Sequence, residues 1–452
     1  MQRNTYSNWN GRVRVSPDRI ARPADEAALV REIVEAGLRG AAVKAVGSGH
    51  SFNSIMATTG TLVDMSRFDR VLSIDHERRL VRVQSGMKLR DLVVVLERNG
   101  LALPNIGAWM EQTISGVLAT GTHGTAGRWR ANLTDALVSY RLVDGRGDVR
   151  VVEGEDTRWL PLGFFGVVTE VVLRCVPLFH VVHLRRTGAL GPAIDGLDDA
   201  LAQHDFVDLR FVGAIARGAL STWDVTEAPP SRTDHARFEL EGVRQYAINH
   251  AVQGWSRLGA LPVLNRRIYR AVGELYMRDG ESAPKTSVWW KGLTFNSRGF
   301  APAHDEYEFA LPRECTREFL HEVAAHMQQR WDTPSLEIQV RFSDATDIVL
   351  APNRDRSTMW FNINVFDARD ANPAVMRLAE MVRAWGGRPH WCKVVPFIFN
   401  GDPVADIDAW EQVRRGYDPM GLFLNSYYQR HLRPSMSSTA TRSARFGDKR
   451  AA

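Results

Sequence analysis

The chain has 452 residues, of which 44% are hydrophobic and 24% are charged, proportions that are typical of a globular protein with two or three domains. Its net charge of +5 is small and spread along the sequence, without the basic stripe that nucleic-acid binding requires. Its 3 cysteines lie far apart and indicate neither a disulfide framework nor a zinc cluster, so we expect no metal site.

The N-terminal part alternates short helices and strands between many glycines. Apolar residues at helical spacing follow Asp25, and Gly37 and Gly40 end this pattern, so we expect a helix between them. A second amphipathic stretch predicts a helix at 88–98. Strands are expected at 41–46, 61–65, 71–74 and 80–84, and a hairpin turn at 144–147. This order indicates an α+β fold and not a strict βαβ repeat.

The segment AVGSGHSFN, residues 45–53, places His50 in a glycine turn directly after a short apolar strand. Gly47 and Gly49 can take a positive φ, so that consecutive backbone N–H groups converge on a pyrophosphate. The dinucleotide fingerprint G-x-G-x-x-G is not matched, because its last glycine would fall at Phe52. A turn with an incidental histidine fits the tripeptide Gly-His-Ser equally well.

A second glycine-rich segment covers residues 107–127. Short hydroxyl side chains alternate with its glycines, which lets the backbone approach a large flat ligand closely. Two such segments in one domain indicate a long cofactor of two parts, and a flexible loop is the alternative. A tight turn at 161–172 adds a weaker signal. The hydroxyl residues are Ser115, Thr120, Thr122 and Thr125.

The second half of the chain is less regular. We expect it to begin after Pro177 and to contain a weakly patterned polar region at 222–239 and a helical stretch at 246–276. The small, polar and basic residues at 434–452 predict a disordered tail. Strand patterns return at 287–293, 335–342 and 359–365.

One of these strands carries a polar face. In 335–342 the period-two alternation puts Glu337, Gln339 and Arg341 on one side, spanning about 13 Å. A carboxylate, an amide and a guanidinium in a row could bind a polyhydroxylated substrate. The row could also be the solvent face of an edge strand, which is the commoner case.

Lys393 is the other catalytic candidate, in the sequence His390-Trp391-Cys392-Lys393. Burial would lower the pKa of this lysine, and a nearby anion would hold it charged. An ordinary surface lysine is the alternative. Asn362 and Asn364 share a strand face and could add neutral hydrogen bonds.

In their order and spacing, these segments resemble the aldonolactone oxidoreductases of the vanillyl-alcohol-oxidase type, a group that includes gulonolactone, arabinonolactone and galactonolactone oxidases or dehydrogenases and the alditol oxidases. The resemblance extends to about residue 433. It implies a two-part α+β FAD-binding domain of the PCMH type at 1–178 and an α+β C-terminal cap domain at 179–433 that covers the isoalloxazine ring. The matching segments are Asn8-Trp9, AVGSGHSF, EQTISG, ATGTHGTAG, GVVTEVVL, QVRF, RPHW-x-K and DPMGLFLN.

The resemblance also implies roles for single residues. FAD would be attached covalently, through its 8α-methyl carbon, to His50. Arg341 and Lys393 would bind the hydroxyl being oxidised, while hydride passes from a carbinol carbon to flavin N5 and O2 or another electron acceptor reoxidises the flavin. The residues expected to contact FAD are Gly47, Ser48, Gly49, His50, Ser51, Gly107, Ser115, Gly116, Thr120, His123, Gly124, Val168, His390 and Lys393.

Three positions depart from the family pattern. Gln339 stands where relatives have glutamate, Asn364 where they often have histidine, and Cys392 where they have glycine. Glu337, two residues earlier, offers a carboxylate on the same face. The expected substrate is a sugar 1,4-lactone; an alditol or another alcohol is one alternative, and a flavin-binding protein with little turnover is another. Gly107 leaves room for oxygen and favours an oxidase.

The N-terminal segment lacks the apolar stretch of a signal peptide, and no run approaches the roughly 18 apolar residues that span a membrane. We therefore expect a cytoplasmic protein that is at most peripherally associated with a membrane.

Overall fold

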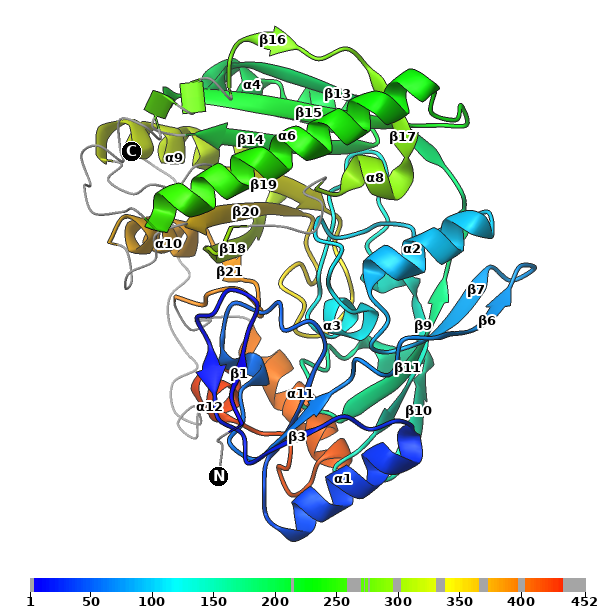
Figure 1. The fold of residues 1–452 in the computed structure, drawn as a ribbon. Coiled ribbons are helices and arrows are strands. Elements are labelled where there is room, and N and C mark those ends of the chain that lie inside the picture. Colours follow the sequence, from blue (N-terminus) through cyan, green and yellow to red (C-terminus); the bar gives the residue numbers. More distant parts are fainter. Residues whose placement is uncertain are drawn as a thin grey trace.

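The computed structural model describes residues 4–212, 215–257, 270–271, 273–274, 277–295, 302–330, 338–365, 373–396 and 403–433. Figure 1 shows the N-terminal part of the chain around α1 and β3, and a large sheet beyond it that the long helix α6 crosses. Glu337 and the predicted tail at 434–452 lie outside the described residues.

The first part of the fold is a small parallel sheet covered by one helix. Asp25 begins α1 (Glu26–Leu38), because its carboxylate accepts a hydrogen bond from the Ala28 N–H at 2.8 Å. Leu29 and Ile33 on α1 are fully buried against the sheet. The predicted helix and the first two predicted strands are confirmed. The strand order is β3 (Arg19–Ala21), β5 (Thr61–Asp64) and β4 (Val43–Val46), and a hairpin of β1 (Tyr6–Ser7) and β2 (Arg14–Val15) precedes it.

A five-stranded antiparallel sheet follows. The predicted hairpin and both predicted strands are confirmed, and α2 (Leu89–Arg98) and α3 (Ile114–Ala119) share a hydrophobic core with this sheet. The strand order is β10 (Val149–Glu153), β9 (Leu137–Val143), β11 (Val167–Arg174), β7 (Leu80–Gln84) and β6 (Val71–Asp75), and a separate pair is formed by β8 (Leu101–Ala102) and β12 (Val176–Pro177). Short 3-10 helices lie at Ser54–Met56, Thr134–Ala136, Gly154–Arg158 and Arg313–Cys315.

The second half of the chain builds a nine-stranded antiparallel sheet. The predicted strand at 359–365 is confirmed, and the one at 335–342 is confirmed over its described residues. The strand order is β16 (Gly280–Glu281), β13 (His180–Ala189), β15 (Arg217–Thr226), β14 (Phe206–Val212), β19 (Ile338–Ser343), β20 (Thr358–Val365), β18 (Asp305–Pro312) and β21 (Arg388–Pro389), with β17 (Lys285–Val288) also paired to β13.

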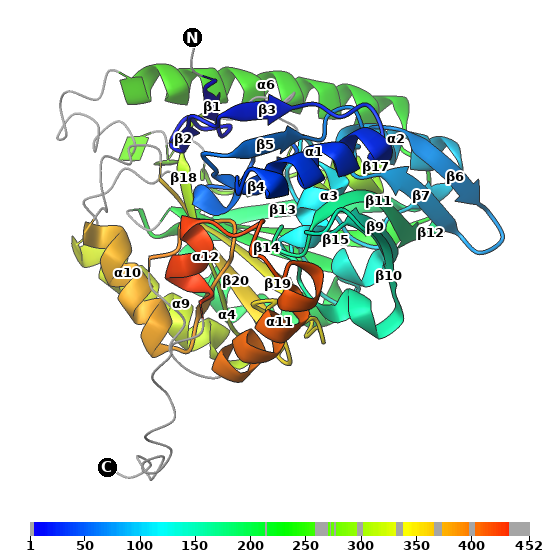
Figure 2. The ribbon, with the colours of Figure 1, turned by 90° about the horizontal axis from the view of Figure 1, so that it is seen from below.

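This large sheet has one apolar and one polar face. Gln339 on β19 lies opposite Asn362 on β20, which lies opposite Glu308 on β18, so the three side chains share a face. Val340 and Phe361 alternate with them and point to the other face. Helices cover that apolar face: α4 (Leu190–Asp195), α9 (Thr316–Arg330) and α10 (Pro373–Ala384), which Figure 2 shows, and α5 (Leu197–Gln203). The polar face is turned toward the N-terminal half of the chain, where Arg341 on β19 donates a hydrogen bond to the His123 carbonyl.

The end of the described chain returns to the N-terminal half. Figures 1 and 2 show α11 (Pro403–Tyr417) and α12 (Ser426–His431) beside the strands of that half. Val43 N–H donates to the Leu422 carbonyl at 2.8 Å, and Trp410 Nε1 donates to the Leu160 carbonyl at 2.7 Å. The domain boundary at residue 178 stays a prediction. The last described helices belong to the proposed second domain, but the segment that contains them contacts the proposed first domain.

Two local predictions differ from the structure. The polar region at 222–239 contains the end of β15 and the start of α6 (Arg232–Arg257), so it is more regular than its pattern indicated. The expected strand at 287–293 ends at Val288 and continues as α8 (Trp289–Leu293). In this helix Trp289 is buried in the core, and Trp290 Nε1 donates a hydrogen bond to Glu97 on α2 at 2.8 Å.

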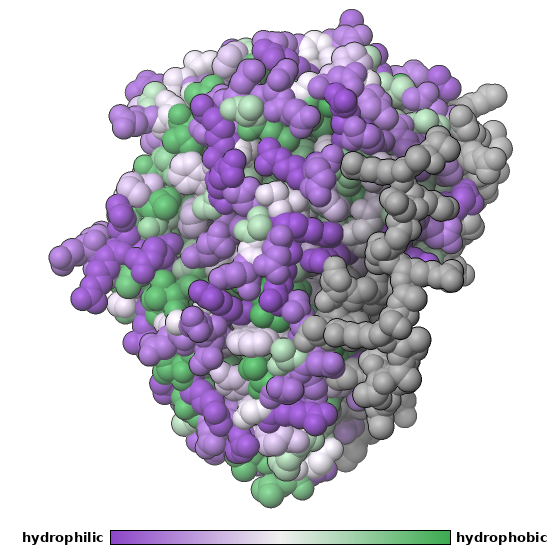
Figure 3. Space-filling view, turned by 180° about the vertical axis from the view of Figure 1, so that it is seen from behind, coloured by the Kyte–Doolittle hydropathy of each residue, from purple (hydrophilic) through white to green (hydrophobic). Residues whose placement is uncertain are grey.

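The surface mixes polar and apolar side chains. Figure 3 shows hydrophilic residues interspersed with hydrophobic ones over the described part of one face. Among the described helices, none is both long and apolar enough to cross a membrane.

Candidate active site

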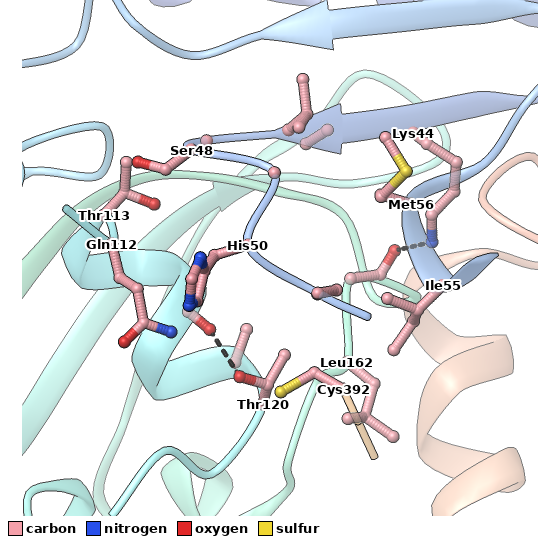
Figure 4. Close-up of a pocket in the computed structure, with 18 residues that line it drawn as sticks. Lys44, Ser48, His50, Ile55, Met56, Gln112, Thr113, Thr120, Leu162 and Cys392 are labelled. Atoms are coloured by element: carbon pink, nitrogen blue, oxygen red, sulfur yellow. Dashed lines mark hydrogen bonds between the residues drawn. The ribbon is translucent and has the colours of Figure 1, made fainter. Parts of the chain in front are cut away.

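Two cavities meet where the glycine turn approaches the polar face of the large sheet. The first is lined by the turn at 47–51 and by part of the second glycine segment (Figure 4). The second lies over the polar face and is lined by side chains of β18, β19 and β20. His50, Gln112 and Cys392 line both cavities. A long ligand in the first cavity would therefore reach the second beside His50.

The turn of the first cavity has no room for side chains at its glycines. A Cβ atom at Gly47 would overlap the Thr113 hydroxyl and lie 2.7 Å from the methyl carbon of that threonine. Gly49 has a φ of +61°, a conformation that favours glycine. Ser48 Oγ donates a hydrogen bond to the Glu111 carbonyl. The two glycine-rich segments are thus packed against each other, and their backbones form a narrow cradle.

His50 is enclosed by aromatic rings. Its imidazole lies 4.7 Å from the Trp9 ring and is stacked on Trp109 at 5.7 Å, with an interplanar angle of 11°. Burial lowers the pKa of His50 well below its usual range, and the positive charge of Lys393 acts in the same direction. The imidazole is therefore neutral at physiological pH, and a neutral ring keeps a nitrogen lone pair for bonding. Figure 4 shows the ring between Gln112 and Thr120.

The hydroxyl residues of the second glycine segment fall into two groups. Gly116 and Thr120 line the first cavity, where Thr120 Oγ1 donates to the Gly116 carbonyl at 2.8 Å. Ser115 Oγ donates instead to the Ser85 carbonyl at 2.8 Å, and Thr125 Oγ1 donates to the Val207 carbonyl. These two hydroxyls hold backbone segments together, so they are not directed into either cavity.

Three further residues expected beside a cofactor lie outside the lining of both cavities: Gly107, Gly124 and Val168. A Cβ atom at Gly124 would overlap the Asn105 side chain, so close packing against Asn105 requires a glycine at this position. At Gly107 a Cβ atom would lie 2.8 Å from the Thr122 methyl carbon. The space beside Gly107 is therefore occupied by Thr122.

A buried carboxylate organises the second cavity. Glu308 is only 1% exposed; it accepts a hydrogen bond from Arg341 Nη2 at 2.5 Å and lies 3.8 Å from Lys393 Nζ. Burial acts to raise the pKa of Glu308, but Arg341 and then His123 outweigh burial and hold that pKa well below its usual range. Arg341 is anchored a second time, because Nη1 donates to the His123 carbonyl at 3.3 Å. The guanidinium is thereby fixed on the cavity wall.

Lys393 lies in the second cavity in contact with Glu306. Its ammonium group also lies 4.9 Å from the centre of the Phe52 ring. Burial lowers the pKa of Lys393 to about 7. The Glu306 carboxylate, in contact with the ammonium group, favours its charged form. The predicted lysine is therefore a half-enclosed cation beside a carboxylate and not a surface residue.

Two buried histidines complete the cavity. The His123 ring is stacked on Trp360 with centroids 3.6 Å apart, and burial lowers its pKa to about 4. His390 Nδ1 lies 3.3 Å from Cys392 Sγ, and burial lowers the pKa of this histidine too. His123, His390 and Glu308 offer ligand atoms within 4.8 Å of one another. Arg341, already bound to Glu308, places a cation there and disfavours a metal ion.

The polar strand faces contribute neutral groups. Gln339 and Asn362 line the second cavity, and Gln339 Nε2 donates a hydrogen bond to Asp208 on β14. Asn364 lies further along β20, outside the cavity lining. Glu337 falls outside the described residues.

Sequence reasoning missed the acidic residues of this site. Glu306 and Glu308 belong to DEYEFALP at 305–312, where acidic and apolar residues alternate with the period of a strand. That alternation was the available signal. Gln339 stands where relatives have a carboxylate, and the carboxylates near this site come from Asp208 on β14 and Glu308 on β18.

Comparisons with known proteins extend these observations. Residues 17–153 match the family model described as FAD binding domain, and residues 171–431 match the one described as D-arabinono-1,4-lactone oxidase. The chain is 32% identical to L-gulono-1,4-lactone dehydrogenase of Mycobacterium tuberculosis, over 95% of this chain and 99% of that protein. It is 27% identical to L-gulonolactone oxidase of Mus musculus, over 94% and 97% of the two chains.

A solved structure shows the same fold. The crystal structure of cholesterol oxidase from B. sterolicum aligns with a TM-score of 0.71 over 95% of this chain and 97% of that one, at 14% identity. At this identity the likeness concerns the fold alone. The predicted α+β architecture with an FAD-binding domain of the PCMH type is confirmed.

Proposed function

Because the chain belongs to the FAD-linked aldonolactone oxidoreductases, we propose that it oxidises a CH–OH group of a sugar 1,4-lactone, with arabinono-, gulono- and galactono-1,4-lactone as the substrates to consider. The observation that carries the proposal is the balance of charge in the second cavity. Two cations, Arg341 and Lys393, face two carboxylates, Glu308 and Glu306. The remaining polar groups there are neutral, so the cavity suits a neutral, hydroxylated molecule.

The first cavity fits the cofactor of this family. The cradle between Gly47 and Thr113 admits backbone but no side chain, as a close approach to a bulky anionic ligand requires. Gly47, Ser48, Gly49, Gly116 and Thr120 would hold FAD there. When bound, the flavin supplies the acceptor for the hydride that leaves the carbinol carbon.

We propose that His50 is the point of covalent attachment. The support is its place at the junction of both cavities and its neutral, aromatic surroundings, which preserve a nucleophilic nitrogen. Acid-precipitated wild-type protein should stay yellow and carry the added mass of FAD. His50→Ala should release FAD into the supernatant on precipitation. Free flavin in the supernatant of the wild-type protein would contradict the covalent bond without affecting the proposed reaction.

The chain's own groups have separate tasks in the reaction. Arg341, fixed by Glu308 and the His123 carbonyl, is placed to donate hydrogen bonds to the oxygen of the reacting carbon. Glu306, which is in contact with the Lys393 ammonium group, is the adjacent carboxylate that can take up the hydroxyl proton. The rings of His123, His390 and Trp360 pack into a buried wall that would keep water from the reacting carbon.

A substrate panel tests the proposal. Steady-state rates should be highest with one of the three lactones, lower with xylitol and sorbitol, and lowest with the ring-opened aldonates, whose carboxylate would unbalance the paired charges. An alditol preferred over every lactone would move the substrate to the alditol class on the same fold. Oxidation of aldonates at the rate of their lactones would contradict the charge argument.

The acceptor that reoxidises the flavin, O2 or another molecule, is also part of the proposal. The relatives include both a dehydrogenase and an oxidase. Gly107 favours an oxidase on sequence grounds, while Thr122 fills the space beside it. Oxygen uptake during lactone oxidation, compared with reduction of an artificial dye, distinguishes the two acceptors.

A further inference from the structure

Gln339 is bound through its amide nitrogen to a buried carboxylate on the neighbouring strand. Gln339 is 6% exposed and lines the second cavity, and Asp208, on β14, is 2% exposed. The hydrogen bond runs from Gln339 Nε2 to Asp208 Oδ2. The other oxygen, Asp208 Oδ1, accepts from Arg210 Nε at 2.9 Å, so the carboxylate is itself held in place.

This contact fixes which end of the amide faces the ligand. A carboxylate has no hydrogen to donate, so only the NH2 end of Gln339 can be turned toward Asp208. The amide oxygen is then the end that Gln339 presents to the cavity, and it acts as a neutral hydrogen-bond acceptor. An amide with a free choice of orientation could present either end.

The same contact explains why position 339 is an amide in this chain. A glutamate there would place a second carboxylate against Asp208, and one of the two would have to bind a proton. The negative charge lies instead on β14, one strand away from the cavity wall, where Arg210 balances it. The cavity itself keeps two cations against two carboxylates.

We propose that Asp208 is a positioning residue that orients Gln339 to accept a hydrogen bond from a hydroxyl of the substrate, which makes this pair a determinant of specificity. The proposal rests on the proposed function, because it assumes a hydroxylated substrate in the second cavity. It predicts that the enzyme discriminates against a lactone that lacks the hydroxyl bound by Gln339.

Two substitutions and their combination test the proposal in the FAD-loaded enzyme. Asp208→Asn can pair with either end of the amide, so KM should rise about 3- to 10-fold with kcat changed less than about 2-fold, the effect expected for one neutral hydrogen bond. Gln339→Glu should add an ionisation to the pH profile of kcat/KM. The double variant D208N/Q339E exchanges the carboxylate and the amide, so that position 339 again presents an acceptor oxygen to the cavity, and it should recover part of the KM lost in D208N.

The pH dependence of thermal unfolding tests the contact between positions 208 and 339 without substrate. In Q339E the crowded carboxylates raise a folded-state pKa above its unfolded value of about 4.3. Relative to the wild type, Q339E should therefore lose stability as the pH rises above about 4.3, and D208N should remove this difference in thermal unfolding. Asp205→Asn is the matched control, because Asp205 precedes the same strand but binds Arg128 and the Val225 N–H outside the cavity.

The outcomes separate the two proposals. Rescue of D208N by Q339E, with D205N unchanged in KM, supports the positioning role. An unchanged KM in D208N, or defects that simply multiply in the double variant, overturns that role even if lactones are substrates. If no lactone is oxidised by the wild type but an alditol is, the proposed substrate class fails, and the same KM comparisons made with that alditol decide the role of Asp208.

Discussion

Replacing Glu308 with glutamine removes the buried negative charge on which two cations of the cavity depend. Arg341 Nη2 lies 2.5 Å from this carboxylate and Lys393 Nζ lies 3.8 Å from it. At an effective dielectric constant of about 20, a charge pair at the longer of these separations attracts by about 4 kcal/mol. Breaking one side of a buried ion pair typically costs about 3–5 kcal/mol of folding stability, and we expect E308Q to fall in this range.

The same substitution should reduce catalysis. Arg341 would lose a charge-assisted hydrogen bond worth about 1.5–3 kcal/mol, which corresponds to about a 10- to 150-fold decrease in kcat/KM if its position is needed in the transition state. The assay is lactone oxidation, with rates divided by flavin content, together with denaturant unfolding. A kcat/KM within 2-fold of the wild type would refute the reasoning.

A matched control separates catalysis from stability. Glu411 is also a buried carboxylate, and it binds Arg414 Nε at 2.7 Å and Tyr428 Oη at 2.8 Å away from both cavities. Glu411→Gln should lower stability to a similar degree and leave kcat/KM unchanged. If E411Q and E308Q lowered kcat/KM equally, the loss in E308Q would be a consequence of general destabilisation.

The remaining predictions concern the first cavity. Burial lowers the pKa of Lys44 to about 7 from its ordinary 10.5, so the unfolded state binds the extra proton between these values and stability should rise with pH across that window. Lys44→Met should flatten this rise in denaturant unfolding, and an unchanged slope would contradict the assignment. Gly47→Ala should lower FAD content, because its Cβ would overlap Thr113, and adding Thr113→Ala should restore part of it. Gly37→Ala, with nothing within 4 Å, should leave FAD content unchanged, and equal losses in G47A and G37A would argue against the packing explanation.

The features that the sequence predicted well are those that neighbouring residues determine. The helix after Asp25 begins with a side-chain cap, and the strand at 359–365 follows from its apolar alternation. The glycine turn around His50 lines a cavity, and its contact with a nucleotide stays a prediction. The family resemblance then supplied the cofactor.

The features that the sequence left open depend on which strands become neighbours. Glu308 meets Arg341 only because β18 pairs with β20 and β20 with β19, an order that no local pattern reveals. Gln339 was interpreted as the loss of a carboxylate, since its partner Asp208 lies 131 residues earlier in the chain. Ser115 and Thr125 were expected beside a ligand, but their hydroxyls donate to the backbone carbonyls of Ser85 and Val207.

Anaerobic mixing of the FAD-loaded protein with L-gulono-, L-galactono- and D-arabinono-1,4-lactone tests the central claim most directly, because it needs no assumption about the electron acceptor. We expect at least one lactone to bleach the visible flavin band within the mixing experiment, at one equivalent of lactone per flavin, and the corresponding aldonate to leave the band unchanged. A flavin band that none of the three lactones bleaches would contradict the assignment of this cavity to lactone oxidation.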